Sequence, residues 1–217
     1  MLPLSPRRRF LSLAALASAA AALFVTKPRF SAAGSGATDE NTVACLSNLN
    51  RIARAYALYA RDFDGKIPRG VDPEDHFHPG IWQNPEASGG EFYDDALSAP
   101  MLHQVLRPYV ASPEVFHCPG DVGWKVSRLQ ISGINQGLTN VLPTAYKKLG
   151  TSYFCWTIYG FQLSTAADIE NPSQKILLFD GDLWHSNAGR QLINGMFADG
   201  HVQNLTVEQF NRFSPNE

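Results

Sequence analysis

The chain has 217 residues, of which 44% are hydrophobic and 18% are charged, which supports one good folded core and excludes a disordered polypeptide. The net charge of −2 hides an asymmetry, because five of the 18 basic residues precede residue 34 and all 20 acidic residues follow it. From residue 34 onward, 13 basic and 20 acidic residues leave a net charge of −7. An acidic body gives no electrostatic reason to bind nucleic acid, so we expect no nucleic-acid partner.

The first 33 residues have the pattern of an export signal or a membrane anchor. Three arginines precede a run of sixteen apolar or small residues, and this order is typical of export signals. The signal residues that also resemble the twin-arginine export consensus are Arg7, Arg8, Phe10 and Leu11. The alternative is an uncleaved anchor in the inner membrane, although the apolar run is shorter than the about 20 residues that span a bilayer. We therefore expect an exported protein of the periplasm or cell surface.

A short linker and one domain follow the export segment. Residues 34–38 are small and polar enough to form the linker, and residues 39–217 form the domain. A helix capped by Thr38 or Asp39 is predicted to run to about Phe63, because apolar residues recur there at three- and four-residue spacing. Asp64-Gly65 is predicted to end it.

The three cysteines, Cys45, Cys118 and Cys155, can indicate whether the protein works in an oxidising compartment. Three cysteines allow one disulfide with one thiol left over, and an exported protein can form it. We pair Cys45 with Cys118, and three buried reduced thiols are the alternative. The sequence contains no CxxC pair, so it gives no support for a structural zinc site.

The middle of the chain is predicted to be mostly irregular. Prolines and glycines are frequent between residues 68 and 98, and residues 123–150 show little periodicity. A short helix is expected from Pro100 to Arg107, because proline is favoured at the start of a helix and Pro108 ends it. Residues 115–121 read as a packed loop.

The last third of the chain is predicted to form a sheet. Strands are expected at residues 152–159, 175–179, 192–198 and 201–205, from their β-branched and aromatic content. Asp199-Gly200 between the last two indicates a tight hairpin. Thr206 and Gln209 form a capping box for a final helix to Phe213. One long helix followed by an antiparallel sheet gives an α+β fold.

Several segments, in a fixed order, carry a resemblance to a known family. They are Ala44–Ile52, Leu106–Val110, Phe116–Asp121, Thr151–Tyr153, Ile169–Asp180 and Phe197–Val202. Together they resemble the prepilin-type family related to the major pseudopilin of type II secretion, whose members carry a His, nine residues and then Asp-Gly. The resemblance covers roughly residues 44 to 205.

The resemblance implies a pilin-like fold, in which a long N-terminal helix packs on a small antiparallel sheet. It also implies a non-enzymatic envelope protein of a type II secretion or type IV pilus system, whose partners are other pilin-like or secretion-system proteins. The chain departs from the family at its start, where Arg9-Phe10 replaces Gly-Phe and Ala14 replaces the filament-forming Glu. The spacing from His185 to Asp199 is also longer than in the family pattern.

Acidic residues near two predicted turns are the candidate metal ligands. Asp180, Asp182 and Asp199 offer oxygen ligands that suit Ca²⁺, and the related pseudopilins are known for a calcium in a C-terminal loop. With His201, the same residues are the ligands of an alternative function, an exported metal-dependent hydrolase. The simpler interpretation is that Asp before Gly forms turns. We assign no catalytic residue, because no nucleophile elbow is present.

A further alternative is a module that binds a glycan or a protein partner. Exposed indole rings stack on sugars and anchor interfaces. Trp184, in a predicted loop beside His185, is the candidate for such an exposed contact, whereas Trp156 is expected in the core.

Overall fold

The computed structural model describes residues 30–31, 39–79, 93–129, 137–163, 165–187 and 189–215. The export-signal residues, the position of Ala14 and the predicted linker lie outside the described residues. Within the described part, the chain is a mixed helix-and-sheet structure with four antiparallel strands and a long helix at its N-terminal side. No helix in that part is long and apolar enough to cross a membrane.

The helix α1 (Glu40–Asp62) forms where the apolar spacing predicts it. The Asp39 carboxylate accepts a hydrogen bond from the Thr42 backbone N–H at 2.7 Å and so caps the first turn. At the other end, Asp64 and Gly65 take positive φ values of 53° and 82°, which end the helix as predicted.

The sheet has the order β1-β5-β4-β3-β2. Its antiparallel strands are β2 (Tyr153–Cys155), β3 (Ile176–Asp180), β4 (Leu192–Phe197) and β5 (Val202–Thr206), and β1 (Phe30–Ser31) pairs parallel with β5. The predicted hairpin is confirmed, because β4 and β5 pair directly and Gly200 in their turn has a φ of 85°. The capping box of Thr206 and Gln209 starts α8 (Val207–Arg212), also as predicted.

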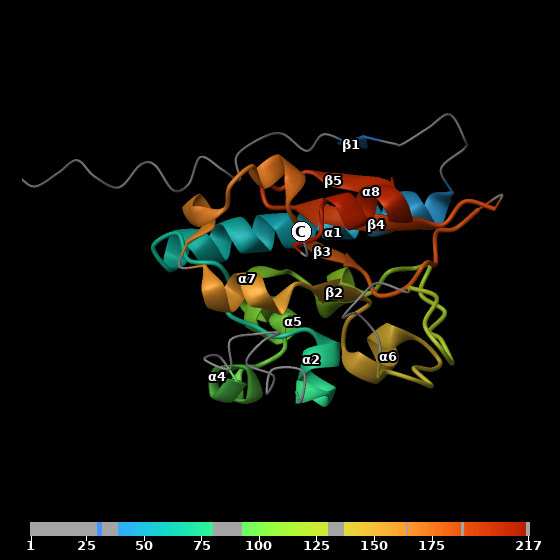
Figure 1. The fold of residues 1–217 in the computed structure, drawn as a ribbon, viewed down its shortest axis with the longest axis horizontal. Helices are drawn as coiled ribbons and strands as arrows, with labels where there is room; N and C mark the ends of the chain where they lie inside the picture. Colours follow the sequence, from blue (N-terminus) through green and yellow to red (C-terminus); the bar gives the residue numbers. More distant parts are fainter. Residues whose placement is uncertain are drawn as a thin grey trace, which may run out of the picture.

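Helices cover both faces of this sheet (Figure 1). The stripe of α1 packs on β4 and β5 over one face, and α8 places Phe210 in the core of the other. In β3 the side-chain alternation is broken by a register shift between Ile176 and Leu178, which leaves Leu177 and Leu178 in the core beneath α1. Asp180, two residues after Leu178, therefore faces α1 as well.

Two sequence predictions are corrected by the structure. The segment expected to be one strand from residue 152 to 159 stops after Cys155 and continues as the helix α7 (Thr157–Gln162). Gly160 of α7 lies so close to Pro68 that an added Cβ would be 2.9 Å from the Pro68 carbonyl oxygen. Tertiary packing of the helix against this segment therefore overrides the strand preference of its residues.

Short helices also occupy segments that the sequence left irregular. Their bounds are α2 (Pro73–Phe77), α4 (Tyr93–Ser98) and α6 (Ala145–Leu149), and the predicted helix near residue 100 is α5 (Leu102–Leu106). Single 3₁₀ turns complete the described part at η3 (Arg107–Tyr109), η4 (Pro113–Phe116), η5 (Ala166–Asp168) and η6 (Pro172–Gln174). Figure 1 shows α2, α4 and α6 grouped on the β2 side of the sheet, away from β5.

Candidate functional site

Five buried polar or sulfur-bearing side chains meet between the first turns of α1 and the sheet. They are Thr42, Cys45, Cys118, Asp180 and His185, and each is at most 3% exposed. We call them the disulfide–histidine cluster. They come from α1, the loop after η4, the end of β3 and the loop after β3, so the tertiary fold alone brings them together.

Cys45 and Cys118 form a disulfide with an S–S distance of 2.00 Å. This is the pair that the sequence analysis chose, and Cys155 is a buried free thiol. The bond joins the second turn of α1 to the loop that follows η4. The same two segments are also joined by the Asn48 side-chain amide, which donates to the His117 carbonyl oxygen at 2.8 Å.

His185 is the centre of the cluster. Its Nε2 lies 3.2 Å from Cys118 Sγ and 3.6 Å from an Asp180 oxygen, and its Nδ1 lies 3.0 Å from the Thr42 hydroxyl. Burial lowers the pKa of His185 to about 4, so the ring is neutral at pH 7. Gly120 makes room for the ring, because an added Cβ there would lie 2.8 Å from His185 Cε1.

Asp180 is fully buried beside that imidazole. Its Oδ2 accepts a hydrogen bond from the Asn194 backbone N–H at 2.7 Å, whereas its Oδ1 has no hydrogen-bond partner within the described residues. Burial raises the pKa of Asp180 well above its usual range, and the Asn194 hydrogen bond opposes this shift. A buried carboxylate oxygen without a partner is costly, so it calls for an explanation.

A second carboxylate, Asp121, fixes the loop that carries Cys118. Its two oxygens accept hydrogen bonds from the backbone N–H groups of Gly123, Ala145 and Tyr146 and from the Ser152 hydroxyl, at 2.7 to 2.9 Å. The Ser152 oxygen in turn accepts from the Cys118 backbone N–H at 3.0 Å. These bonds hold the Cys118 backbone in place independently of its sulfur.

The three carboxylates predicted as calcium ligands are not brought together. Asp180 and Asp182 lie at the end of β3, but Asp199 lies in the β4–β5 turn, and the register pairs Ile176 with Phe197. Asp199 is therefore at the opposite end of β3, a separation of about 13 Å along four residues. The proposed ligand set with His201 fails for the same reason, because His201 bonds Asp199 in that turn.

Asp182 instead binds the neighbouring loop at Arg128. Its Oδ1 accepts a hydrogen bond from the Arg128 backbone N–H at 2.9 Å, and its Oδ2 lies 3.4 Å from Arg128 Nε. The carboxylate is 1% exposed, so it fixes the neighbouring loop from inside the protein.

Trp184 is not the exposed contact that the sequence predicted. Its ring packs 6.1 Å from the ring of Trp124, against the core on the α8 face, and its Nε1 is buried. Trp184 is half-buried, so the glycan-stacking interpretation loses the fully exposed ring on which it depended.

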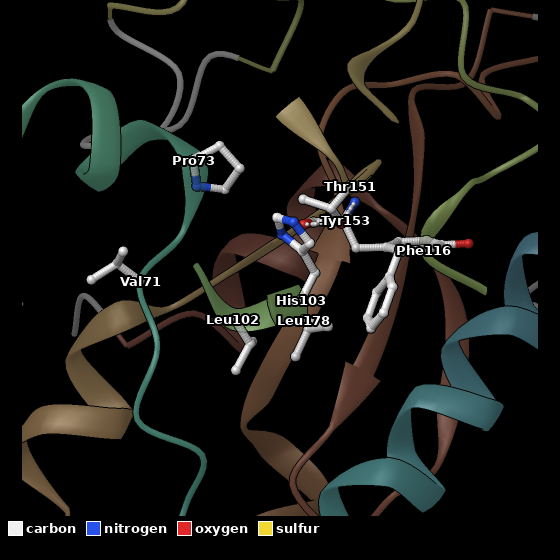
Figure 2. A pocket seen from close by; sticks show the side chains of 8 residues that line it. All are labelled: Val71, Pro73, Leu102, His103, Phe116, Thr151, Tyr153 and Leu178. Carbon is white, nitrogen blue, oxygen red and sulfur yellow. Dashed lines mark hydrogen bonds between the residues drawn. The ribbon is translucent and has the colours of Figure 1, made fainter. Parts of the chain in front are cut away.

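A small pocket is lined by side chains that include His103, Phe116 and Tyr153 (Figure 2). Figure 2 shows the His103 imidazole among the side chains of Thr151, Tyr153 and Phe116. Burial lowers the pKa of His103 to about 4, and the nearby His76 adds to the effect. The pocket has room for about one water molecule, which is too little for an organic substrate.

Comparison with known proteins gives no relative. No protein-family model matches this chain, and neither a curated protein nor a solved structure matches it.

Sequence reasoning paired the cysteines but did not join His185 to them. The three residues are far apart in the chain, so no local spacing links them. The only available signal is that Cys45, Cys118 and Asp180 each lie in a segment that carries the family resemblance.

Proposed function

We propose that the chain is a non-enzymatic, exported, pilin-like protein of the cell envelope, a component of or a derivative of a type II secretion or type IV pilus system. The observation that carries the proposal is the packing of the long helix α1 across β4 and β5 of an antiparallel sheet. This is the arrangement that the resemblance implies for a pilin-like protein. Its partners are then other pilin-like or secretion-system proteins of the envelope.

The disulfide supports export. Disulfides persist in oxidising compartments such as the periplasm and are rare in the cytosol, where thiols are kept reduced. A Cys45–Cys118 bond in the core beneath α1 fits a protein whose working compartment lies outside the cytosol.

Cell fractionation tests export directly. The wild-type chain, with a C-terminal epitope, is expected in the periplasmic or membrane fraction, with Cys45 and Cys118 oxidised on a non-reducing gel. Replacing Arg7 and Arg8 with Lys should retain the protein in the cytosol, because the twin-arginine pattern needs both. The matched control is Arg9→Lys, which removes an arginine outside the pair and should leave export unchanged.

The intact mass of the native protein then distinguishes the two export forms. A mass that begins near residue 34 or 38 indicates a free exported domain, and a full-length mass in the membrane fraction indicates an anchor. A wild-type protein that stays in the cytosol with reduced thiols would contradict the proposal.

A further inference from the structure

We propose that the disulfide–histidine cluster is a zinc site when its cysteines are reduced, with Cys45, Cys118 and His185 as ligands and Asp180 beside them as the fourth. The disulfide and the metal ion are then alternative states of one site. The inference does not depend on the proposed function, because it rests on the geometry of the cluster.

One pair of ligand atoms, Cys118 Sγ and His185 Nε2, has nearly the spacing of an edge of a zinc tetrahedron, and the two sulfurs, bonded at 2.00 Å in the disulfide, must move apart to about 3.8 Å once they are reduced. The two sulfurs and one His185 ring nitrogen all lie within 4.8 Å of one another. With Zn–S of about 2.3 Å and Zn–N of about 2.0 Å, a sulfur and a nitrogen ligand lie about 3.5 Å apart. The observed distance from Cys118 Sγ to His185 Nε2 is 3.2 Å.

Asp180 extends this set to a fourth ligand. Its Oδ2 lies 3.6 Å from His185 Nε2, close to the about 3.4 Å expected between a nitrogen and an oxygen ligand. Asp180 lies next to the three-residue group rather than within it. The Asn194 backbone N–H occupies one lone pair of Oδ2, which leaves the second lone pair for the ion, and Oδ1 has no hydrogen-bond partner among the described residues.

The imidazole is held in the orientation that a metal ligand needs. The Thr42 hydroxyl lies 3.0 Å from Nδ1, so it can accept the Nδ1–H and leave the lone pair on Nε2 facing Cys118. Histidine ligands generally bond through their second nitrogen in this way, which fixes tautomer and ring position.

The site persists without the sulfur–sulfur bond. The Cys118 backbone N–H bonds Ser152, and the Cys45 carbonyl oxygen accepts from the Tyr153 hydroxyl at 3.4 Å. The amide of Asn48 also joins α1 to the Cys118 loop. Reduction therefore leaves both thiols facing His185.

Ligand type and burial favour zinc at this position. Sulfur and imidazole ligands in tetrahedral geometry select zinc over calcium or magnesium. A site with residues at most 1% exposed and four protein ligands is structural, because it leaves no open position for a substrate.

The chemistry balances with a dithiol reductant. The dithiol gives two electrons and two protons to the Cys45–Cys118 bond, becomes a cyclic disulfide and leaves two protein thiols. Zinc then displaces the two thiol protons to solvent as it binds the thiolates. Oxidation by a disulfide reverses the step and releases the ion.

Cobalt titration of the full chain tests the site. The protein is reduced with a dithiol, freed of reductant without oxygen, and titrated with Co²⁺, whose tetrahedral thiolate complexes give a charge-transfer band and intense visible bands. We expect a single cobalt ion per chain, displaced by Zn²⁺, and no such spectrum for the oxidised protein. An octahedral spectrum, or the same spectrum from the oxidised protein, would overturn the proposal.

Variants identify the ligands. Cys118→Ser and His185→Gln should weaken Co²⁺ binding by about 100-fold or more, and Thr42→Val by about 10-fold, because ligands count for more than the residues that orient them. The control is Cys155→Ser, which removes the third cysteine and should bind cobalt like the wild type. If His185→Gln binds as tightly as the wild type, or if Cys155→Ser abolishes binding, the assignment is wrong.

Circular dichroism of each reduced sample shows whether reduction unfolds the chain. Zinc should then restore the native spectrum to the wild type and to Cys155→Ser but not to His185→Gln. If zinc bound only to the thiols of an unfolded chain, the three proteins would give the same circular dichroism spectrum with zinc. This result would also overturn the proposal.

Discussion

The two faces of the sheet differ in the kinds of side chain that pack against them. On the face covered by α8, aromatic rings pack together: Phe179 lies 5.3 Å from Trp156 and 5.0 Å from Phe210 between ring centroids. On the face covered by α1, apolar residues surround a buried disulfide, a histidine and an Asp180 oxygen that has no hydrogen-bond partner in the described part of the chain. One face is held mainly by apolar burial, and the other adds sulfur and hydrogen-bonding groups.

The two faces are therefore stabilised by different kinds of interaction. Apolar burial is non-directional and depends on area and fit, so aromatic rings serve stability. Buried polar groups stabilise a fold only when each has a partner, so a closed polar cluster is maintained at a cost. The α1 face therefore combines a large apolar core with the disulfide–histidine cluster, whereas aromatic packing predominates on the α8 face.

The largest expected effect is on the aromatic face. Phe179→Ala should lower the free energy of unfolding by about 4 kcal/mol, because it leaves a cavity among fully buried rings. The measurement is urea unfolding monitored by circular dichroism. The matched control is Phe77→Ala at a side chain that is 49% exposed, where the loss should stay below about 1 kcal/mol. Equal losses at the two sites would show that burial of Phe179 among the aromatic rings does not stabilise the α8 face.

The next effect concerns the hydrogen bonds that hold the Cys118 loop. Asp121→Ala should cost about 2–3 kcal/mol, because three backbone N–H groups and the Ser152 hydroxyl lose their acceptor. The measurement is thermal and urea unfolding of the oxidised protein. Asp168→Ala is the control, since this carboxylate accepts from Thr165 at an exposed turn and its loss should cost less than about 1 kcal/mol. A loss no larger at Asp121 than at Asp168 would show that the loop does not depend on this carboxylate.

The smallest effect is a pH dependence at His103. The folded pKa of about 4 lies below the unfolded value of 6.5, so the unfolded chain binds more protons between these values. The stability that His103 contributes is therefore present above about pH 6.5 and is lost as the pH falls toward 4. Between pH 7 and pH 4.5, the unfolding free energy of His103→Gln should fall by about 1–2 kcal/mol less than that of the wild type. This value is reduced to allow for the partial exposure of the His103 ring.

Urea unfolding of both proteins across this range measures the effect. Between pH 7 and pH 8 the stabilities of wild type and His103→Gln should run parallel, because His103 is neutral in both the folded and the unfolded chain there. A difference between the proteins that does not change from pH 7 to pH 4.5 would contradict the prediction.

The elements that sequence reasoning predicted well are those with a strong local pattern. The stripe of α1, the Asp199-Gly200 turn and the Thr206 capping box each depend on residues a few positions apart, and all three are present. The strand predicted through residue 159 was wrong beyond Cys155, because Gly160 packs α7 against Pro68. Local propensity cannot register a contact with a segment about ninety residues away in the chain.

The candidate site was harder to predict than the elements that carry it. Asp180 and Asp199 were predicted to share a site because both lie at acidic turns, but the antiparallel register places them at opposite ends of β3. The absence of a CxxC pair argued against zinc, since that motif detects only ligands that are neighbours in sequence. Cys45, Cys118 and His185 are not neighbours, so only their three-dimensional arrangement reveals the group.

By itself, the sequence determined where α1 begins and ends and how β4 returns as β5, because caps, turns and apolar periodicity act over a few residues. Only the tertiary structure decided that a one-residue shift in β3 turns Asp180 toward α1 and that His185 lies against the disulfide. The physical reason is that a buried polar cluster is assembled by packing between distant segments, and the energy of that packing is not contained in any one of them.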